Sequence, residues 1–295
     1  MDSERWTVVS KWWTSRTVPA LAPAIKIFTV HRSLSTVHLP PPPLLCYKIK
    51  TMISESIDTM KRPNQSLDVY LLGLVEFESC LSLQERLADE ISQRRDGRAA
   101  LILCEHPPII TMGRDASHAH LACEPGELVV RRMEVRWLNR GGGAVMHAPG
   151  QLAAYPILPV DRLGFGLVEL RARLELSLLD VCREQRVSAW REATEPGVWC
   201  RCGRLAGLGV AVRSGVTQHG LFVNVAPSME IQQFVRMPSG GRVSSLAAQR
   251  SRPTSMHSVR ESLIRNLADR FGYEQFHVYT GHPSLRRTRQ SVAIA

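Results

Sequence analysis

The stretch 138–152 reads Leu138-Asn139-Arg140-Gly141-Gly142-Gly143-Ala144-Val145-Met146-His147-Ala148-Pro149-Gly150-Gln151-Leu152. Three consecutive glycines lie between two apolar runs, at 135–138 and 152–158. Such glycines let the backbone approach a ligand closely, and they supply positive φ angles that other residues resist. Arg140 begins the loop, His147 ends it, and Pro149-Gly150 predicts a turn before a strand at 151–156. The pattern therefore predicts a strand, a glycine loop and a second strand, although a hairpin whose glycine-rich turn binds nothing would look the same.

Outside this stretch, apolar periodicity predicts the remaining elements. Apolar residues recur at three- and four-residue steps over 75–94, 167–185 and 255–271, which predicts helices there. Residues 115–127 are expected to form a loop. Short apolar runs bounded by turn residues predict strands at 67–74, 99–104, 109–112, 197–199, 204–212 and 216–225. Because strands and helices alternate irregularly, the order favours an α+β fold with a mixed β-sheet and flanking helices.

The two ends of the chain differ from its middle. Residues 1–66 hold three of the six tryptophans, a proline run at 40–43 and little periodicity. We interpret them either as a transit peptide or as translated sequence upstream of a true start at Met52 or Met60, and we expect disorder in either case. The expected division is therefore a disordered extension or mis-assigned start at 1–66, a folded domain at 67–280 and a basic, flexible tail at 281–295.

Charge and cysteine usage limit the function classes. The formal net charge of the 295 residues is +10, and half of it lies in residues 1–62. The remainder is mildly basic and has no Lys and Arg cluster before residue 286, so we expect no nucleic-acid partner. No apolar run reaches the ~20 residues of a membrane span. Seven irregularly spaced cysteines favour a reducing compartment, the cytoplasm. Cys200-Arg201-Cys202 is too tight for a zinc pair, so no metal is expected.

Five motifs occur in order along the folded part of the chain. They are 101–114 (LILCEHPPIITMGR), 140–152 (RGGGAVMHAPGQL), 203–210 (GRLAGLGV), 219–225 (HGLFVNV) and 237–240 (MPSG). From Leu72 to about Phe271 the chain resembles the octanoyltransferase family. The resemblance implies the catalytic-domain fold of biotin and lipoate protein ligases, an α/β-type domain around a mixed sheet. It also implies transfer of an octanoyl or lipoyl group from acyl-carrier protein, without a cofactor, to a lysine of a lipoyl domain. Acceptors of this kind occur in 2-oxoacid dehydrogenases and in the glycine-cleavage protein.

The resemblance also implies which residues form the site. The family's nucleophilic cysteine corresponds to Ser239, and the lysine that lowers the pKa of that cysteine corresponds to Arg204. The family commonly has His-Gly-Pro-Gly where this chain has His147-Ala148-Pro149-Gly150. The substrate pocket is expected from three segments, which contribute Arg140, Gly141, Gly142, Gly143, Ala144, Val145, Met146 and His147, then Gly207, Leu208 and Gly209, and finally Gly220, Leu221 and Phe222.

The two replaced positions change the chemistry. A thiol with a pKa of ~8.5 ionises with help from one nearby cation, whereas a serine hydroxyl needs an adjacent base. Arg204 stays protonated and cannot be that base. Three interpretations remain open. In the first, Ser239 is acylated with His147 or His219 as base. In the second, no covalent step occurs and the pocket only aligns the acyl thioester and the lysine. In the third, the domain binds an acyl chain or carrier without catalysis. An ATP-dependent lipoate ligase is a further alternative, since the fold is shared.

Residues beside the motifs have simpler expected roles. A further thiol at 104, 200 or 202 could replace the nucleophile, but each is expected to be a small buried apolar group. Glu105 is expected to bond loop backbone, and His106 to be structural. Asn224, between two valines, is expected to be a satisfied amide of the core.

Overall fold

The computed structural model describes residues 65–164, 166–237 and 240–285. Most of the expected N-terminal extension and of the expected tail lies outside the described residues, as does Ser239, so the division at 66 and 280 stays a prediction. None of the helices in the described part combines the length and the apolar character that crossing a bilayer requires.

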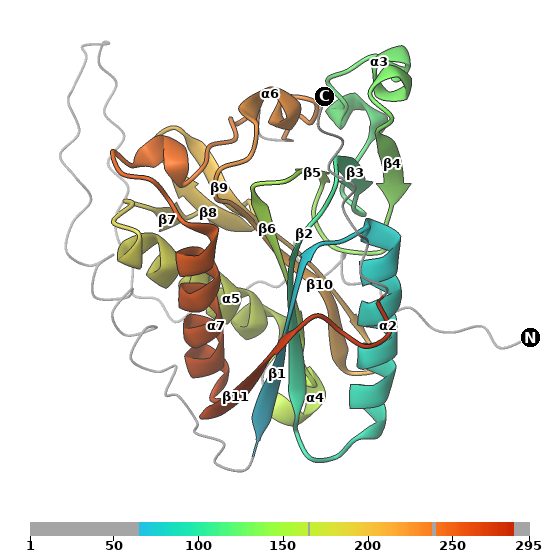
Figure 1. The fold of residues 1–295 in the computed structure, drawn as a ribbon, viewed down its shortest axis with the longest axis vertical. Helices are drawn as coiled ribbons and strands as arrows, with labels where there is room; N and C mark the ends of the chain where they lie inside the picture. Colours follow the sequence, from blue (N-terminus) through green and yellow to red (C-terminus); the bar gives the residue numbers. More distant parts are fainter. Residues whose placement is uncertain (1–64, 165, 238–239, 286–295) are drawn as a thin grey trace, which may run out of the picture. The chain divides into compact units, whose positions relative to one another are not determined.

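Eight strands form one mixed sheet at the centre of the fold (Figure 1). Its first three strands run parallel to one another, and the remaining neighbours are antiparallel. In spatial order the strands are β11 (Gln275–Thr280), β1 (Ser66–Leu74), β2 (Ala99–Glu105), β6 (Gln151–Ile157), β10 (Val216–Asn224), β9 (Gly203–Arg213), β8 (Gly197–Cys200) and β7 (Trp190–Arg191). The α+β class with a mixed sheet is thus confirmed.

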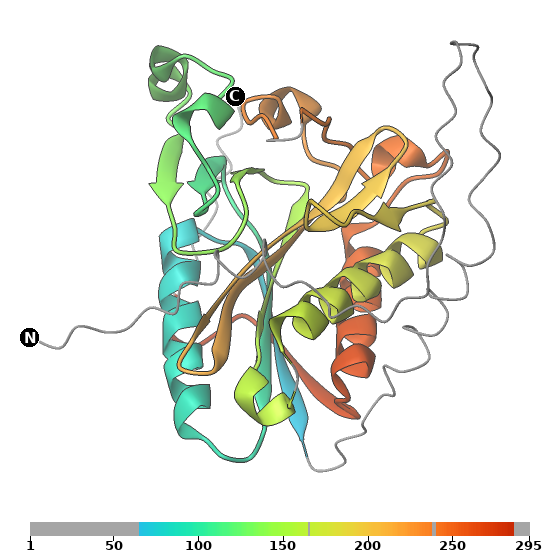
Figure 2. The ribbon, with the colours of Figure 1, turned by 180° about the vertical axis from the view of Figure 1, so that it is seen from behind.

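Helices cover both faces of this sheet, as Figures 1 and 2 show from opposite sides. Helix α2 (Phe77–Gln93) packs on one face, while α5 (Leu167–Glu184) and α7 (Met256–Phe271) pack on the other. Successive side chains of a strand point to opposite faces. In β2, Leu101 and Leu103 therefore join the core beneath α5 and α7, whereas Ile102 and Cys104 join the core beneath α2. This double burial explains why β2 is an unbroken apolar run.

The glycine stretch belongs to a second, three-stranded sheet. Strand β3 (Ile109–Met112) lies in its middle, parallel to β4 (Glu134–Trp137) and antiparallel to β5 (Ala144–His147). The glycines connect β4 to β5, and these two strands do not pair with each other. The alternative of a hairpin with a glycine-rich turn is therefore wrong, because β3 lies between the two strands.

Most predicted elements are confirmed within a few residues, and three expectations need correction. Residues 144–147 were expected to be part of the glycine loop, but they form β5, and the strand expected at 151–156 is β6 of the large sheet. Residues 115–127 are not only loop, since they contain a 3-10 turn at His118–His120 and the start of α3 (Pro125–Val130). Strand β11 was not expected, although its residues Phe276, Val278 and Tyr279 favour strands. Three further short helical segments are α4 (Val160–Leu163), α6 (Met229–Gln232) and a 3-10 turn at Ala247–Gln249.

Candidate functional site

The motifs meet around one small cavity, where β5, β9 and β10 approach α6 at the upper end of the large sheet in Figure 1. Six residues that the sequence assigns to the site line it, namely Ala144, Val145, Met146, Arg204, Gly207 and Phe222. Sequence reasoning did not assign the other lining residues, which are Gln151, Asn224, Gln232, Val235, Met237 and Val243. Met237 lies in the last motif, whereas Gln232 on α6 carries no motif that could have pointed to it.

The cavity has a volume of only about 20 Å³. Pockets that hold small ligands usually measure about 300–1,000 Å³, and about 20 Å³ accommodates roughly one water molecule. A chain of eight carbons can therefore enter only if lining side chains move. The flexible side chain of Met237 is well suited to such movement, because Met has three rotatable bonds and adapts to irregular space.

Gly141 and Gly142 pack against the backbone of β9. The Gly141 N–H donates to the Val210 carbonyl over 3.1 Å. Gly142 has a φ of +78°, a conformation that favours glycine. A Cβ on Gly209 would lie 2.8 Å from the Gly141 carbonyl oxygen, closer than such atoms can approach. The close approach that these glycines permit is thus between two chain segments, and it fixes β5 beside β9 at the cavity.

Arg140 is buried beneath this layer, with 1% of its surface exposed. Its Nη1 donates to the carbonyls of Gly141 and Gly143, at 3.0 and 3.1 Å. Its Nη2 donates to the Thr111 carbonyl at 2.9 Å and to Thr111 Oγ1 at 2.8 Å. The guanidinium also lies 5.6 Å from the ring centroid of Phe222. Arg140 therefore holds the glycine stretch in shape and does not line the cavity.

His147 uses both ring nitrogens inside the protein. Its Nδ1–H donates to Gln151 Oε1 at 2.8 Å, so its Nε2 carries the lone pair, which accepts from the Thr111 hydroxyl at 3.0 Å. Burial, with help from nearby His106 and Arg140, holds the pKa of His147 well below its ordinary value. In this geometry the lone pair that a general base needs is already occupied. The catalytic role of His147 stays a prediction, and the structure favours a positioning role.

Two predicted pocket residues lie on the far side of the sheet. Leu221 is fully buried in the core beneath α5 and α7, and Leu208 packs against that same core. Phe222 faces the cavity because neighbouring residues of a strand point to opposite faces. Gly220 contacts the neighbouring strand, since a Cβ there would lie 2.1 Å from the Ala154 carbonyl oxygen. Leu208, Leu221 and Gly220 thus support the pocket wall without lining it.

The expected roles of Asn224 and Glu105 are confirmed. Asn224 accepts from Gln151 Nε2 at 3.0 Å and donates to the Ser244 carbonyl at 3.1 Å. Glu105 accepts from the Gly150 N–H at 2.8 Å, at the turn that follows the glycine stretch. Among the three alternative thiols, those of Cys104 and Cys200 are buried as expected, whereas Cys202 is exposed.

Arg204 gives the cavity its charge. Burial lowers the pKa of Arg204, and the nearby carboxylate of Glu195 opposes that shift. Within residues 65–164, 166–237 and 240–285, the Arg204 guanidinium has no hydrogen-bond partner. The cavity lining contains no Asp or Glu among the described residues. A small cavity lined by both polar and apolar side chains, with a guanidinium that has no hydrogen-bond partner among the described residues, suits an acyl chain that ends in a polarised carbonyl oxygen or a carboxylate.

His219 predicts a pH dependence of stability. Burial, together with the charge of Arg140, lowers the pKa of His219 to about 3, against about 6.5 in an unfolded chain. Below about pH 6.5 the unfolded chain takes up a proton that folded His219 cannot, so stability is constant above that pH and falls below it. We expect the free energy of unfolding to fall by about 2 kcal/mol between pH 7 and pH 5 for this residue alone.

Guanidinium unfolding at pH 7, 6 and 5 measures this loss. The control is His219→Asn, since asparagine tolerates the φ of +58° at this position. The variant should lose less stability than the natural chain over the same pH interval. Equal losses in the two proteins would contradict the assignment.

Comparisons with known proteins agree with this arrangement. The family model described as the lipoyl protein ligase A/B catalytic domain matches residues 77–268. The octanoyltransferase of Geobacter metallireducens is 37% identical over 206 residues, which are 68% of this chain and 90% of that protein. The octanoyltransferase of Geotalea uraniireducens is 36% identical over 187 residues, which are 62% of this chain and 83% of that protein.

Solved structures show the same fold at low sequence identity. A lipoate-protein ligase A bound with ATP superimposes with a TM-score of 0.61 at 17% identity, covering 74% of this chain and 90% of that chain. The bi-partite lipoate protein ligase of Thermoplasma acidophilum gives 0.60 at 16% identity, covering 74% and 89%. With its family model, its close curated relatives and its fold in agreement, the chain belongs to the lipoyl protein ligase A/B catalytic domain family, among the octanoyltransferases.

Proposed function

We propose that the chain transfers an octanoyl or lipoyl group from acyl-carrier protein to a lysine of a lipoyl domain. The observation that carries the proposal is the Arg204 guanidinium, which has no hydrogen-bond partner among the described residues and lines a small cavity together with residues of β5, β9 and β10. The mildly basic body of the chain suits acidic carrier proteins. Free thiols, without a disulfide in the described residues, support a cytoplasmic location.

In the proposed reaction the lysine amine of the acceptor attacks the thioester carbonyl directly. A carbon–nitrogen bond forms, the carbon–sulfur bond breaks, and the proton lost by the amine goes to the departing carrier sulfur. Arg204 donates hydrogen bonds to the carbonyl oxygen, on which negative charge develops in the transition state. The remaining rate enhancement comes from alignment of the two substrates, which contributes several kcal/mol, about 7 at the lower end of the usual range.

The geometry of His147 favours this direct route over an ester on Ser239. An ester route needs a free imidazole lone pair beside the serine, and that of His147 is occupied by the Thr111 hydroxyl. His219 is neutral and is the remaining candidate base. Its position relative to Ser239 is not described, so the ester route stays the second mechanism.

The main alternative is a domain that binds an acyl chain or carrier without catalysis, because Ser239 and Arg204 replace the family's cysteine and lysine. An assay with octanoyl acyl-carrier protein and a lipoyl domain, followed by mass spectrometry of the acceptor, separates the two. Binding of the carrier with no modified acceptor, even at high protein concentration, would establish the binding module. Modification that requires ATP and free octanoate would instead identify a ligase.

Arg204→Met is expected to lower the rate of octanoyl transfer by about 10²–10³-fold, the usual loss when one oxyanion donor is removed. Met keeps much of the side-chain volume and removes the charge. Ser239→Ala should stay within about threefold of the natural rate, because the direct route forms no serine ester. Single-turnover kinetics measure both rates. The exposed Arg201→Met is the matched control and should leave the rate unchanged. Loss of transfer in Ser239→Ala would exclude the direct route.

A further inference from the structure

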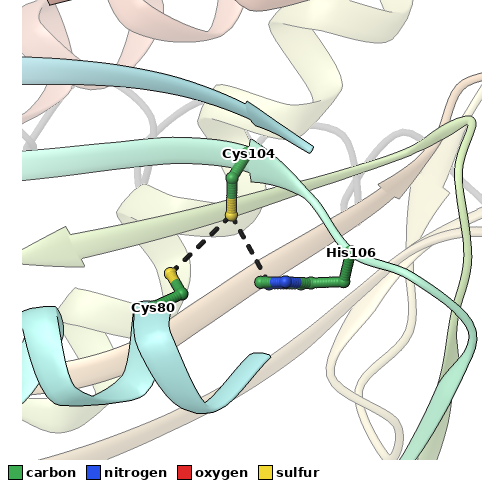
Figure 3. Close-up of side chains that lie close together, drawn as sticks. All are labelled: Cys80, Cys104 and His106. Carbon is green, nitrogen blue, oxygen red and sulfur yellow. Dashed lines mark hydrogen bonds between the residues drawn. The ribbon is translucent and has the colours of Figure 1, made fainter. Parts of the chain in front are cut away.

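Three potential metal ligands converge between α2 and the large sheet, apart from the cavity. Cys80 extends from α2, Cys104 lies near the end of β2, and His106 follows that strand (Figure 3). The two sulfur atoms are 3.8 Å apart, and Cys104 Sγ lies 3.4 Å from His106 Nε2. The three ligand atoms all lie within 4.8 Å of one another. None of these residues lines the candidate acyl pocket.

The distances match the edges of a zinc tetrahedron. Zinc binds cysteine sulfur at about 2.3 Å and histidine nitrogen at about 2.0–2.1 Å. Tetrahedral angles then place two sulfur ligands about 3.8 Å apart, and a sulfur and a nitrogen about 3.5 Å apart. The observed separations of 3.8 and 3.4 Å are close to these two values. Two of the distances between ligand atoms therefore already match those of a tetrahedral zinc site.

The tautomer of His106 also suits a metal ligand. Its Nδ1 lies 2.8 Å from the Val75 carbonyl, which can only accept, so Nδ1 carries the hydrogen. Nε2 therefore carries the lone pair, which lies 3.4 Å from Cys104 Sγ and accepts from the Tyr155 hydroxyl at 2.8 Å, a hydrogen bond that a metal bound at Nε2 would replace. A carbonyl that holds the outer nitrogen in this way is the usual support of a metal-bound histidine.

The net charge of the occupied site suits its complete burial. Cys80, Cys104, His106 and Tyr155 are each at most 2% exposed. When Zn²⁺ binds, two zinc–sulfur bonds form, two S–H bonds break, and both protons leave to solvent. A dication with two thiolates, a neutral imidazole and a neutral phenol has no net charge, so the burial penalty of an unpaired ion does not arise.

We propose that Cys80, Cys104 and His106, with the Tyr155 hydroxyl as fourth group, form a structural zinc site. It joins α2 to the end of β2 and is independent of the acyl-transfer proposal. No metal was expected from the sequence, because Cys104-Glu105-His106 supplies only two ligands and 23 residues separate Cys80 from Cys104. Since the four side chains are enclosed, the site is loaded as the chain folds.

The test uses the full chain, refolded under reducing conditions with Zn²⁺ and then exchanged into metal-free buffer. We expect about one zinc per chain by mass-spectrometric metal analysis, and less than about one tenth for Cys80→Ala and for Cys104→Ala. Cys182→Ala is the matched control, since Cys182 is also buried but lies in the other core. Tyr155→Phe should weaken zinc affinity by about 10–100-fold.

Cobalt in the natural chain gives a readout that does not depend on whether the variants fold. Refolding with Co²⁺ should produce an intense sulfur-to-cobalt charge-transfer absorption and the strong visible bands of tetrahedral geometry. Three results would each overturn the proposal. They are a natural chain that retains neither metal, zinc retention unaffected in both cysteine variants, or a Cys80–Cys104 disulfide in protein purified without reductant.

Discussion

We expect the double variant Ser239→Cys, Arg204→Lys to transfer octanoyl about 10²–10⁴-fold faster than the natural chain, the range that a well-placed proton transfer contributes. A cysteine with a nearby cation forms a thiolate close to neutral pH, which a serine hydroxyl cannot do. The double variant also restores the pair that the family resemblance assigns to these two positions. The surrounding wall, including Gly207 and Phe222, is already in place around the cavity.

The two single variants and trapping of the intermediate are the controls. Ser239→Cys alone and Arg204→Lys alone should each gain less than the pair, since the thiol and the lysine act as a unit. An octanoyl thioester on the new cysteine should appear by mass spectrometry and disappear with hydroxylamine. Cys202→Ser should be included as background, because Cys202 is exposed and could be acylated by itself. No gain in rate and no trapped thioester would show that the pocket has lost its catalytic geometry.

Arg140→Ala is expected to lower the free energy of unfolding by about 3–5 kcal/mol. The change leaves three backbone carbonyls and the Thr111 hydroxyl without their donor, at about 1–3 kcal/mol for each buried group. Burial lowers the pKa of Arg140 to about 10, so removing the cation regains roughly 3 kcal/mol. The four lost bonds outweigh that gain. Urea unfolding compares the midpoints at an unchanged slope.

Arg162→Ala is the matched control for this loss. Arg162 also donates to two backbone carbonyls, those of Ile91 and Ser92, but a quarter of its side chain is exposed. Water can replace its bonds, so we expect a loss below about 1 kcal/mol. Arg140→Met separates charge from volume, since it fills most of the space without a cation. If Arg140→Met were more stable than the natural chain, the free-energy cost of burying the cation would exceed the stabilisation that its hydrogen bonds provide.

Periodicity was sufficient to predict the elements that bury one continuous face. The three long helices each place apolar residues at three- and four-residue steps against the sheet, and each was predicted within a few residues. Strand β2 is apolar on both faces, a pattern that requires a central position. Strand β11 was missed because all its side chains are exposed at the sheet edge, so burial imposes no alternation on its sequence.

The candidate site was only partly predictable, because β5 of the small sheet and β9 and β10 of the large sheet meet through tertiary packing, which the order of the sequence does not show. Ala144, Val145 and Met146, which the family resemblance assigns to the substrate pocket, line the cavity, and their contact with substrate stays a prediction. The same reasoning could not tell Phe222, which lines the cavity, from Leu221, which faces the opposite core. The sequence also could not show that the Arg140 side chain donates hydrogen bonds to its own loop and does not reach the cavity. These distinctions depend on which face each residue presents, and they are fixed only when β5 lies beside β9.

The pairing of β1 with β11 has a consequence for how the chain is made. These are the first and last strands of the described fold, and they lie side by side in parallel. During synthesis β1 emerges roughly 200 residues before β11, which at 5–20 residues per second is about 10–40 s. For that interval the outer edge of β1 has no neighbour within the described fold and presents unpaired backbone groups to other chains. Throughout that interval the unpaired edge of β1 is a site at which a newly made chain can pair with another and aggregate.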